Sequence, residues 1–281
     1  MSPALSAAAP NAWAQPRKGI DPRWLSSSLL TLILVIGQWR FQILGDSYVP
    51  WLLALSTALA AEILLHWLHT GRGVNLLSAY ISGNSVAILL KPQGSLLWPF
   101  VVCALLAILS KYVLRYRDRH LWNPTNFSVC ALLLLAPQAV SMLSHQWGND
   151  LGIVVAIWAI GLLVVTRARV WHLTLGYLVL FVAFAWLRTL VNGHTFQAEI
   201  GPVTGPMYQL FMFFMVTDPR TIVSGRKQQL GVLVLVALAE CLIRLAADFE
   251  WLGASNPLLL APPMFALFFV GPLFLWLQLR A

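Results

Sequence analysis

Two sets of proline-interrupted apolar segments follow the same order along this chain. Each set has a short apolar stretch ending at an X-Pro pair, a longer apolar stretch, an Asn-Pro pair and a Leu-Leu-Leu-Ala-Pro run. These landmarks fall at Lys91-Pro92, Asn123-Pro124 and 132–137 in the first set, and at Asp218-Pro219, Asn256-Pro257 and 258–262 in the second. Repeats with broken hydrophobic segments at matching places favour a membrane protein that binds something between its repeats.

The composition indicates that lipid is the solvent of this chain. Of its 281 residues, 59% are hydrophobic and only 10% are charged, whereas soluble domains carry about 25% charged residues. The net charge of +8 does not indicate nucleic-acid binding, because the basic residues sit in short loops between apolar stretches. The three cysteines lie inside apolar runs without metal-ligand or CxxC spacing, so they are expected to pack as small core side chains.

The apolar stretches predict an all-α integral membrane protein with about ten transmembrane segments. A full span needs roughly 20 residues, and two of the stretches, 75–90 and 205–216, are shorter, while 126–144 is interrupted by Pro137. These three are expected to be half-helices or broken helices. The ten stretches are 25–44, 49–68, 75–90, 95–114, 126–144, 151–166, 170–190, 205–216, 229–246 and 257–279.

The charge distribution predicts the orientation. With the N-terminus inside, most of the 18 lysines and arginines fall in inner loops, as the positive-inside rule requires. We therefore expect a multi-pass protein of a bacterial inner (cytoplasmic) membrane, with both termini cytoplasmic. Residues 1–24 are expected to form a flexible tail, and no cleavable signal peptide is expected.

An odd number of spans in each repeat predicts that the halves are inverted. Residues 25–144 are the first five-span repeat and residues 151–279 the second. The expected architecture is therefore a 5+5 inverted repeat with broken helices meeting between the halves.

Several motifs resemble one family of membrane electron-transfer subunits. The run Phe213-Phe-Met-Val-Thr217-Asp218-Pro219-Arg-Thr221 resembles a Phe-Met-x-Thr-Asp-Pro-x-Thr signature, and Trp122-Asn123-Pro124 resembles a Phe-Asn-Pro motif. Both belong to the family of the B subunit of the sodium-translocating NADH:quinone oxidoreductase and the D subunit of the Rnf electron-transport complex. Ser110-Lys111-Tyr112 fits the helix that leads into the second motif. The order of parts covers about residues 50 to 275, and the size is similar to a short branch met in enediyne biosynthesis clusters.

The resemblance implies a flavin. In that family, FMN is attached through a phosphoester to the Thr of a Ser-Gly-Ala-Thr motif. The corresponding loop here, 141–150, lacks this motif, which occurs nowhere in the chain. The resemblance thus implies non-covalent FMN or riboflavin in a subunit that holds the cofactor without catalytic residues of its own, and a purely structural role stays open. Other membrane or periplasmic redox proteins are the implied partners.

The candidate cofactor-binding residues lie at the broken helices. They are Ser82, Gly83, Asn84, Asn123, Thr217 and Asp218. Small residues at the first three positions allow close approach of a ligand or of another helix. Asp218 either shapes a cofactor or cation pocket or caps the turn that follows it. No metal ligand set is predicted.

Two carboxylates fall deep within apolar stretches, where ionisable groups suggest function. Glu62 has His66 four residues on, on the same helix face, and the two are candidates for proton or ion coupling. Glu240 has Arg244 at the same spacing, which favours a structural ion pair. His66 and His172 both lie near the ends of apolar stretches, where an interfacial position is favoured over haem ligation.

The role of one basic run stays open, and so do two other classes of function. Residues 115–120 read Arg-Tyr-Arg-Asp-Arg-His, and such a run holds a flavin phosphate or an anionic partner, or contacts lipid headgroups and sets orientation. The same repeat also suits a secondary transporter or ion channel without a redox cofactor. A scaffold that only docks partner proteins is the third reading.

Overall fold

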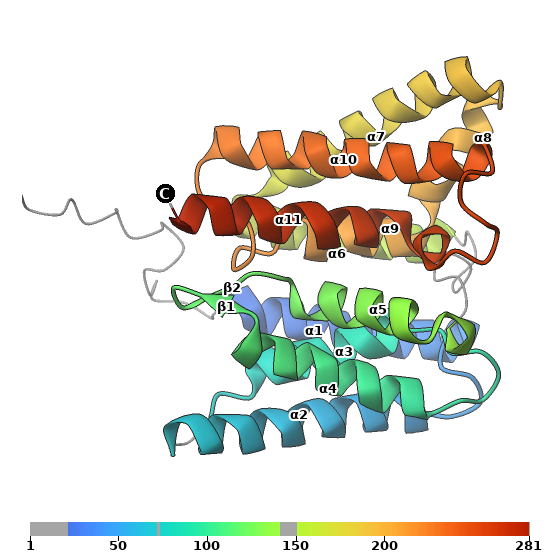
Figure 1. Cartoon of the computed structure of the whole chain (residues 1–281). Coiled ribbons are helices and arrows are strands. Elements are labelled where there is room, and N and C mark those ends of the chain that lie inside the picture. Colours follow the sequence, from blue (N-terminus) through green and yellow to red (C-terminus); the bar gives the residue numbers. More distant parts are fainter. Residues whose placement is uncertain (1–21, 72–73, 141–150, 281) are drawn as a thin grey trace, which may run out of the picture.

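The chain folds into helices joined by short turns (Figure 1). The computed structural model describes residues 22–71, 74–140 and 151–280. The α-helices are α1 (Pro22–Phe41), α2 (Val49–Thr70), α3 (Leu77–Leu89), α4 (Trp98–Val113), α5 (Pro124–Leu135), α6 (Leu151–Arg167), α7 (Trp171–Asn192), α8 (Phe196–Ile200), α9 (Pro206–Leu210), α10 (Arg226–Asp248) and α11 (Pro262–Arg280). The remaining elements are β1 (Arg115–Tyr116), β2 (Arg119–His120), the 3-10 turns η1 (Pro137–Ala139), η3 (Gly201–Thr204) and η5 (Pro257–Leu260), and the π-helix η4 (Phe211–Met215).

The helices form two stacked groups, α1–α5 and α6–α11 (Figure 1). In the first group α2 packs on α3 and α4, and α4 packs on α5. In the second group α7 packs on α10, and α10 packs on α11. The groups meet where α5 contacts α11 and where α1 contacts α6, so the interface between the two halves is made of helix faces.

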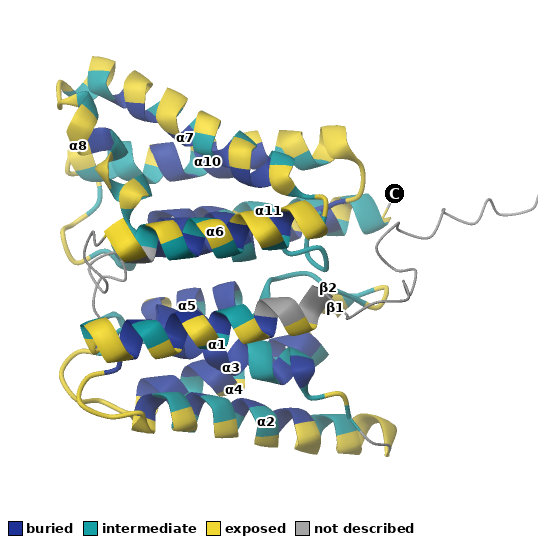
Figure 2. Ribbon diagram, turned by 180° about the vertical axis from the view of Figure 1, so that it is seen from behind, coloured by how far each residue is buried: buried dark blue, intermediate teal, exposed yellow. Residues whose placement is uncertain are grey.

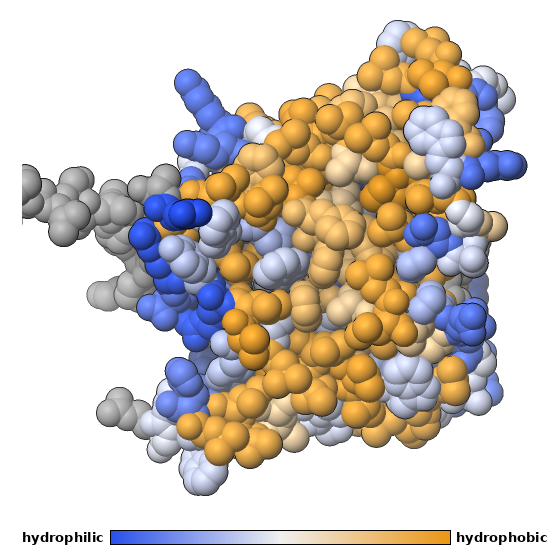
Figure 3. Space-filling model, viewed as in Figure 1, coloured by the Kyte–Doolittle hydropathy of each residue, from blue (hydrophilic) through white to orange (hydrophobic). Residues whose placement is uncertain are grey.

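The outer surface is that of a protein in lipid. Apolar residues cover the middle of the molecule, while hydrophilic residues gather at its two ends (Figure 3). Large apolar side chains on α2, α7 and α10 are more than half exposed, including Leu52, Leu64, Trp186 and Leu242, and Figure 2 shows such exposed faces on α2 and α7. Water does not favour such a surface, but a bilayer core does.

Four helices of the described chain are long and apolar enough to cross a membrane. They are α2, α7, α10 and α11; the apolar parts of α1, α3, α4, α5 and α6 are shorter, at 10–17 residues. The protein is therefore an all-α, multi-pass membrane protein. The count of ten spans stays a prediction.

The expected short segments are short in the structure. The stretch 75–90 forms α3, of 13 residues, and the stretch 205–216 forms α9 and the π-helix η4, of 5 residues each. In the stretch 126–144, α5 ends at Leu135, two residues before Pro137. Proline removes a backbone donor and disfavours helical geometry in the residue before it, which explains this end.

Matching motifs adopt matching local geometry. Asn123 and Asn256 both cap a following element with φ near −60° and ψ near 125°. Ala136 and Ala261, each before a proline, share an unusual φ near −150° with ψ near 60°. Between these landmarks the halves differ, because the first holds the 12-residue α5 and the second only the four-residue η5. The matching sequence order thus does not give equal elements at this place.

The basic run 115–120 forms a β-hairpin, which the sequence did not predict. Strands β1 and β2 pair antiparallel around Arg117 and Asp118, which both have positive φ, at 45° and 63°. Two consecutive left-handed residues make the tight turn that suits the twist of a two-residue hairpin. The hairpin lies at the same end of the molecule as the end of α11 (Figure 1).

Candidate functional site: a cavity between the two halves

A cavity of about 240 Å³ lies between the two helical groups and is lined by residues of both. Four of the six predicted cofactor residues line it: Ser82 and Asn123 from the first half, Thr217 and Asp218 from the second. Its walls are mostly apolar, and serine, threonine, asparagine and charged side chains also line it. The structure thus brings together residues that lie more than 130 positions apart in the sequence.

Asn123 and Asp218 connect the two halves at the edge of the cavity. The side-chain oxygen of Asn123 accepts hydrogen bonds from the N–H groups of Thr125 and Asn126, which caps α5. Its amide nitrogen donates to Asp218 Oδ2 across 2.9 Å. Asp218 Oδ1 accepts from the N–H of Arg220 at 3.0 Å. Asp218 therefore anchors its own turn, and it also lines the cavity.

One face of α3 forms a wall of the cavity. Ser78, Ser82 and Ser85 lie on this face, at the three- and four-residue spacing of a helix. Ser82 Oγ donates to the carbonyl of Ser78 at 3.0 Å, which satisfies its hydroxyl inside the helix while its oxygen keeps a free acceptor position. The face offers small hydroxyls beside apolar Ile81 and Ile88.

Gly83 and Asn84, predicted for the same site, lie on other faces of α3 and do not line the cavity. A Cβ on Gly83 would stand 2.9 Å from the Cα of Leu55, so this glycine lets α3 approach α2 closely. Asn84 is fully buried; it accepts from Trp51 Nε1 at 2.7 Å and donates to Thr31 Oγ1 at 3.0 Å. A helix of 3.6 residues per turn cannot present three consecutive side chains to one side. Gly83 and Asn84 therefore face neighbouring helices, and their contacts hold these helices together.

The opposite wall comes from the π-helix η4 and the loop after it. Phe213 and Phe214 line the cavity, and Gly161 on α6 lies directly against the Phe213 ring. Thr217 closes this segment by donating its hydroxyl to the carbonyl of Phe213. π-helical turns are rare and frequent at functional sites, and this one places an aromatic ring in the cavity wall.

Lys111 is a site residue that the prediction missed. Its Nζ reaches Glu62 Oε2 at 3.4 Å and the carbonyl of Ser78 at 3.1 Å, and its side chain is 5% exposed. Tyr112 donates its hydroxyl to Glu62 Oε1 at 2.9 Å. Glu62 therefore pairs with α4 and not with His66, the partner predicted for it. A lysine within an apolar helix needs a partner, so the sequence indicated that Lys111 is paired. Only the fold shows which residue is its partner.

The β-hairpin fixes the loop that follows Asp218. Arg119 donates to the carbonyls of Pro219, Arg220 and Ile222, at 3.4, 3.1 and 2.7 Å. His120, the next residue, lines the cavity. Burial, followed by the charges of Arg220, Arg115 and Lys111, lowers the pKa of His120 to about 4, so its ring is neutral at pH 7. One side of the hairpin thus clamps the loop and the other faces the cavity.

A second polar cluster lies away from the cavity, within α7, α9 and α10. Glu240 pairs with Arg244 at 3.1 Å, which confirms the ion pair expected from their spacing. Tyr177 and Tyr208 both donate their hydroxyls to Glu240. All its polar groups are thus satisfied by neighbours, as burial of a charge requires. We interpret this cluster as structural.

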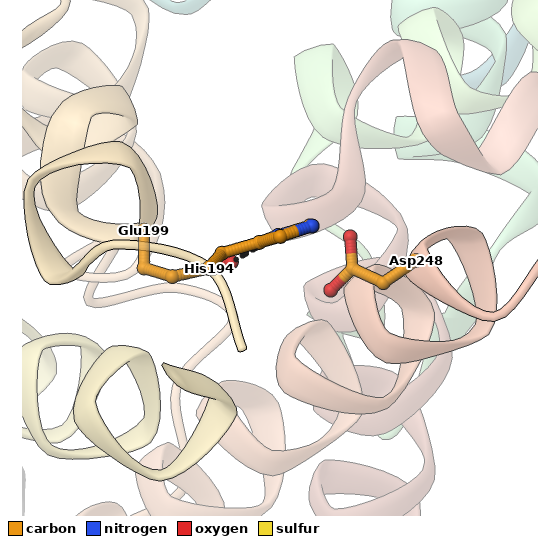
Figure 4. Close-up of side chains that lie close together, drawn as sticks. All are labelled: His194, Glu199 and Asp248. Atoms are coloured by element: carbon orange, nitrogen blue, oxygen red, sulfur yellow. Dashed lines mark hydrogen bonds and ion pairs between the residues drawn. The ribbon is translucent and has the colours of Figure 1, made fainter. Parts of the chain in front are cut away.

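His194, Glu199 and Asp248 form a third cluster, with ligand-type atoms within 4.8 Å of one another (Figure 4). Glu199 already pairs with the buried Arg188 at 2.8 Å. The amide nitrogen of Asn192 donates to both Glu199 and Asp248, at 2.8 Å each. Asn192 thus links two carboxylates through hydrogen bonds. Because Asn192, Glu199 and Asp248 lie on α7, α8 and α10, these bonds connect the three helices.

The fold and the cavity define a class of protein: a helical multi-pass membrane protein with an internal site at the interface of its two halves. No family model matches the chain, and no curated protein shows significant sequence similarity to it. Its function is therefore inferred from the geometry of the site.

Proposed function

We propose that this protein is the membrane subunit of a flavin-dependent electron-transfer system and holds a non-covalent flavin between its halves. The observation that supports this most directly is the convergence of Ser82, Asn123, Thr217 and Asp218 on one cavity. These four residues lie at the broken helices or in the motifs that resemble the electron-transfer family.

The lining fits the chemistry of a flavin. A flavin ring is flat and apolar on its faces and carries hydrogen-bonding groups along its edges. The cavity offers Phe213, Phe214 and Ile88 for the faces, and Ser82, Asn123 and Thr217 for the edges. Its volume of about 240 Å³ lies below the range for ligand pockets, about 300 to 1,000 Å³, so a flavin would fill it and extend beyond it. When bound, the flavin would supply the redox chemistry, and these residues would bind and orient it.

We further propose that the two halves are related as inverted five-span repeats in a bacterial inner membrane, with both termini cytoplasmic. Two observations support this. In the first half α2 packs on α4 and α4 on α5, and in the second half α7 packs on α10 and α10 on α11, in the same order. The helix caps formed by Asn123 and Asn256 also match. The basic hairpin and the cavity mouth would then face the cytoplasm. Membrane or periplasmic redox proteins would be the electron partners.

The test is an absorption and fluorescence spectrum of the purified protein, before and after acid precipitation. We expect flavin absorption that moves into the supernatant on precipitation. Ser85→Leu, which fills the cavity, should remove the signal. Ser56→Leu, on the exposed face of α2, is the matched control and should keep it. Flavin that stays with the pellet would contradict non-covalent binding.

A secondary transporter or channel is the second candidate, and the position of Lys111 favours it. Lys111 lines the cavity and is paired with Glu62, and a buried ion pair beside a cavity is typical of ion or proton pathways. A colourless protein, expressed with riboflavin in excess, would reject the flavin proposal in favour of this one. Uptake into proteoliposomes that depends on Lys111 would then be the next measurement.

A further inference from the structure

The mouth of the cavity carries two arginines that lack a counter-charge. Arg167, at the end of α6, and Arg220, in the loop after η4, both line the cavity. Within the part of the chain that the structure describes, neither guanidinium has a salt-bridge or side-chain hydrogen-bond partner. Lys111 is neutralised by Glu62, and Asp218 is the one carboxylate among the described lining residues. The two arginines therefore make this described part of the lining net positive.

The backbone of Arg220 is held in place. Three hydrogen bonds from Arg119 to the carbonyls of Pro219, Arg220 and Ile222 fix the backbone on both sides of Arg220. The N–H of Arg220 is bound to Asp218 Oδ1. The fixed backbone sets the position of Arg220 beside the cavity, and its planar guanidinium is suited to bidentate recognition of an oxyanion.

His120 adds a group that lacks a partner. His120 lines the cavity, and its buried Nδ1 has no hydrogen-bond partner among the described residues. A buried ring nitrogen without a partner is costly unless a ligand or water satisfies it. A neutral imidazole nitrogen at a cationic mouth matches a ligand that brings both negative charge and hydroxyl groups.

We propose that Arg167, Arg220 and His120 form a subsite for the phosphate group of the ligand that fills the cavity, so that the ligand is a phosphate monoester with its phosphate at the basic mouth. This inference rests on the proposed function and deepens it, because it selects FMN over riboflavin. The arginines that act are not those of the hairpin: Arg115 is engaged with Asp118 and Arg119 with the loop carbonyls.

The experiment is calorimetric titration of the full-length protein, in nanodiscs of uncharged lipid, with FMN and with riboflavin. We expect FMN to bind at least tenfold more tightly than riboflavin. Arg167→Gln/Arg220→Gln should reduce this ratio to near one, through weaker FMN binding and unchanged riboflavin binding. Arg169→Gln/Arg226→Gln removes two exposed charges that do not line the cavity and should leave the ratio unchanged. Unchanged riboflavin binding also shows that the first double variant is folded.

Other outcomes separate the two proposals. Equal binding of FMN and riboflavin by the unaltered protein would overturn the phosphate subsite and leave the flavin proposal standing. Binding of neither flavin, together with arginine-dependent binding of phenyl phosphate, would reject the flavin and support the subsite. An arginine-dependent preference for phosphatidylglycerol nanodiscs, with no preference for FMN, would overturn the subsite and assign the arginines to lipid headgroups.

Discussion

At the scale of single residues, buried charges are set by their partners in space. Glu62 and Lys111 lie on different helices and form a pair at 3.4 Å with little exposure. Removing one member leaves the other charged and unpaired in a medium of low polarity, which costs more than the pair contributed. Replacing both members with apolar groups of similar size avoids that penalty.

We therefore expect Lys111→Met to lower the free energy of unfolding by about 3–5 kcal/mol. Glu62→Leu/Lys111→Met should recover much of this loss, giving a clear coupling between the two sites. Arg115→Gln, at the exposed pair with Asp118, is the control and should change stability by less than about 1 kcal/mol. Denaturant unfolding in detergent is the measurement. Additive losses at positions 62 and 111 would mean that the two groups do not interact.

The lowered pKa of His120 predicts that the stability of the protein depends on pH. Its pKa of about 4 in the folded protein lies below the value of about 6.5 in an unfolded chain. Between these values the unfolded chain binds more protons, so stability is fully present above about pH 6.5 and falls as the pH drops toward 4. Thermal unfolding across this window should show a smaller loss for His120→Gln than for the unaltered protein. His69→Gln, at an exposed position, should follow the unaltered protein.

At the scale of elements, small residues decide how closely helices approach. Gly83 on α3 lies against Ala54, Leu55 and Ala58 on α2. In lipid, such contacts drive helix association, because the hydrophobic effect does not. The added methyl of Gly83→Ala would meet backbone, which cannot move aside as a flexible side chain does.

We expect Gly83→Ala to destabilise the protein by about 1–3 kcal/mol through overpacking. The control is Gly231→Ala on α10, where a Cβ would meet nothing within 4 Å. That variant should be neutral or slightly stabilising, since alanine has the higher helix propensity. Thermal unfolding of the two variants side by side is the measurement. A neutral Gly83→Ala would mean that α2 and α3 are not in such close contact.

At the scale of the whole molecule, the proposed topology can be tested by labelling single cysteines. Cys103, Cys130 and Cys241 are buried, so they are expected to react slowly. Ser47→Cys, Ser95→Cys and Ser255→Cys should be labelled by a membrane-impermeant maleimide from the periplasm. Arg117→Cys, Arg169→Cys and Ser224→Cys should be protected until the membrane is opened. All six positions are exposed. Labelling of both groups from one side would reject the alternating ten-span topology.

The sequence by itself determined the solvent of the molecule, the helical class and the places where helices break. Low charge content and long apolar stretches leave a bilayer as the environment, and the prolines at 137 and 262 begin elements because of their own covalent geometry. These are local properties, so the residues near each position are enough to predict them. The 3.6-residue period also placed Glu240 with Arg244, since both lie on one helix.

Only the tertiary structure decided which of the predicted residues share a site. Ser82, Asn123, Thr217 and Asp218 meet at the cavity, whereas Gly83 and Asn84 turn to other helices. Glu62 has Lys111 as its partner across two helices, and Arg119 reaches a loop 100 residues away. Such contacts depend on how helices rotate and stack against each other, and that is fixed by packing over the whole interface rather than by any local pattern.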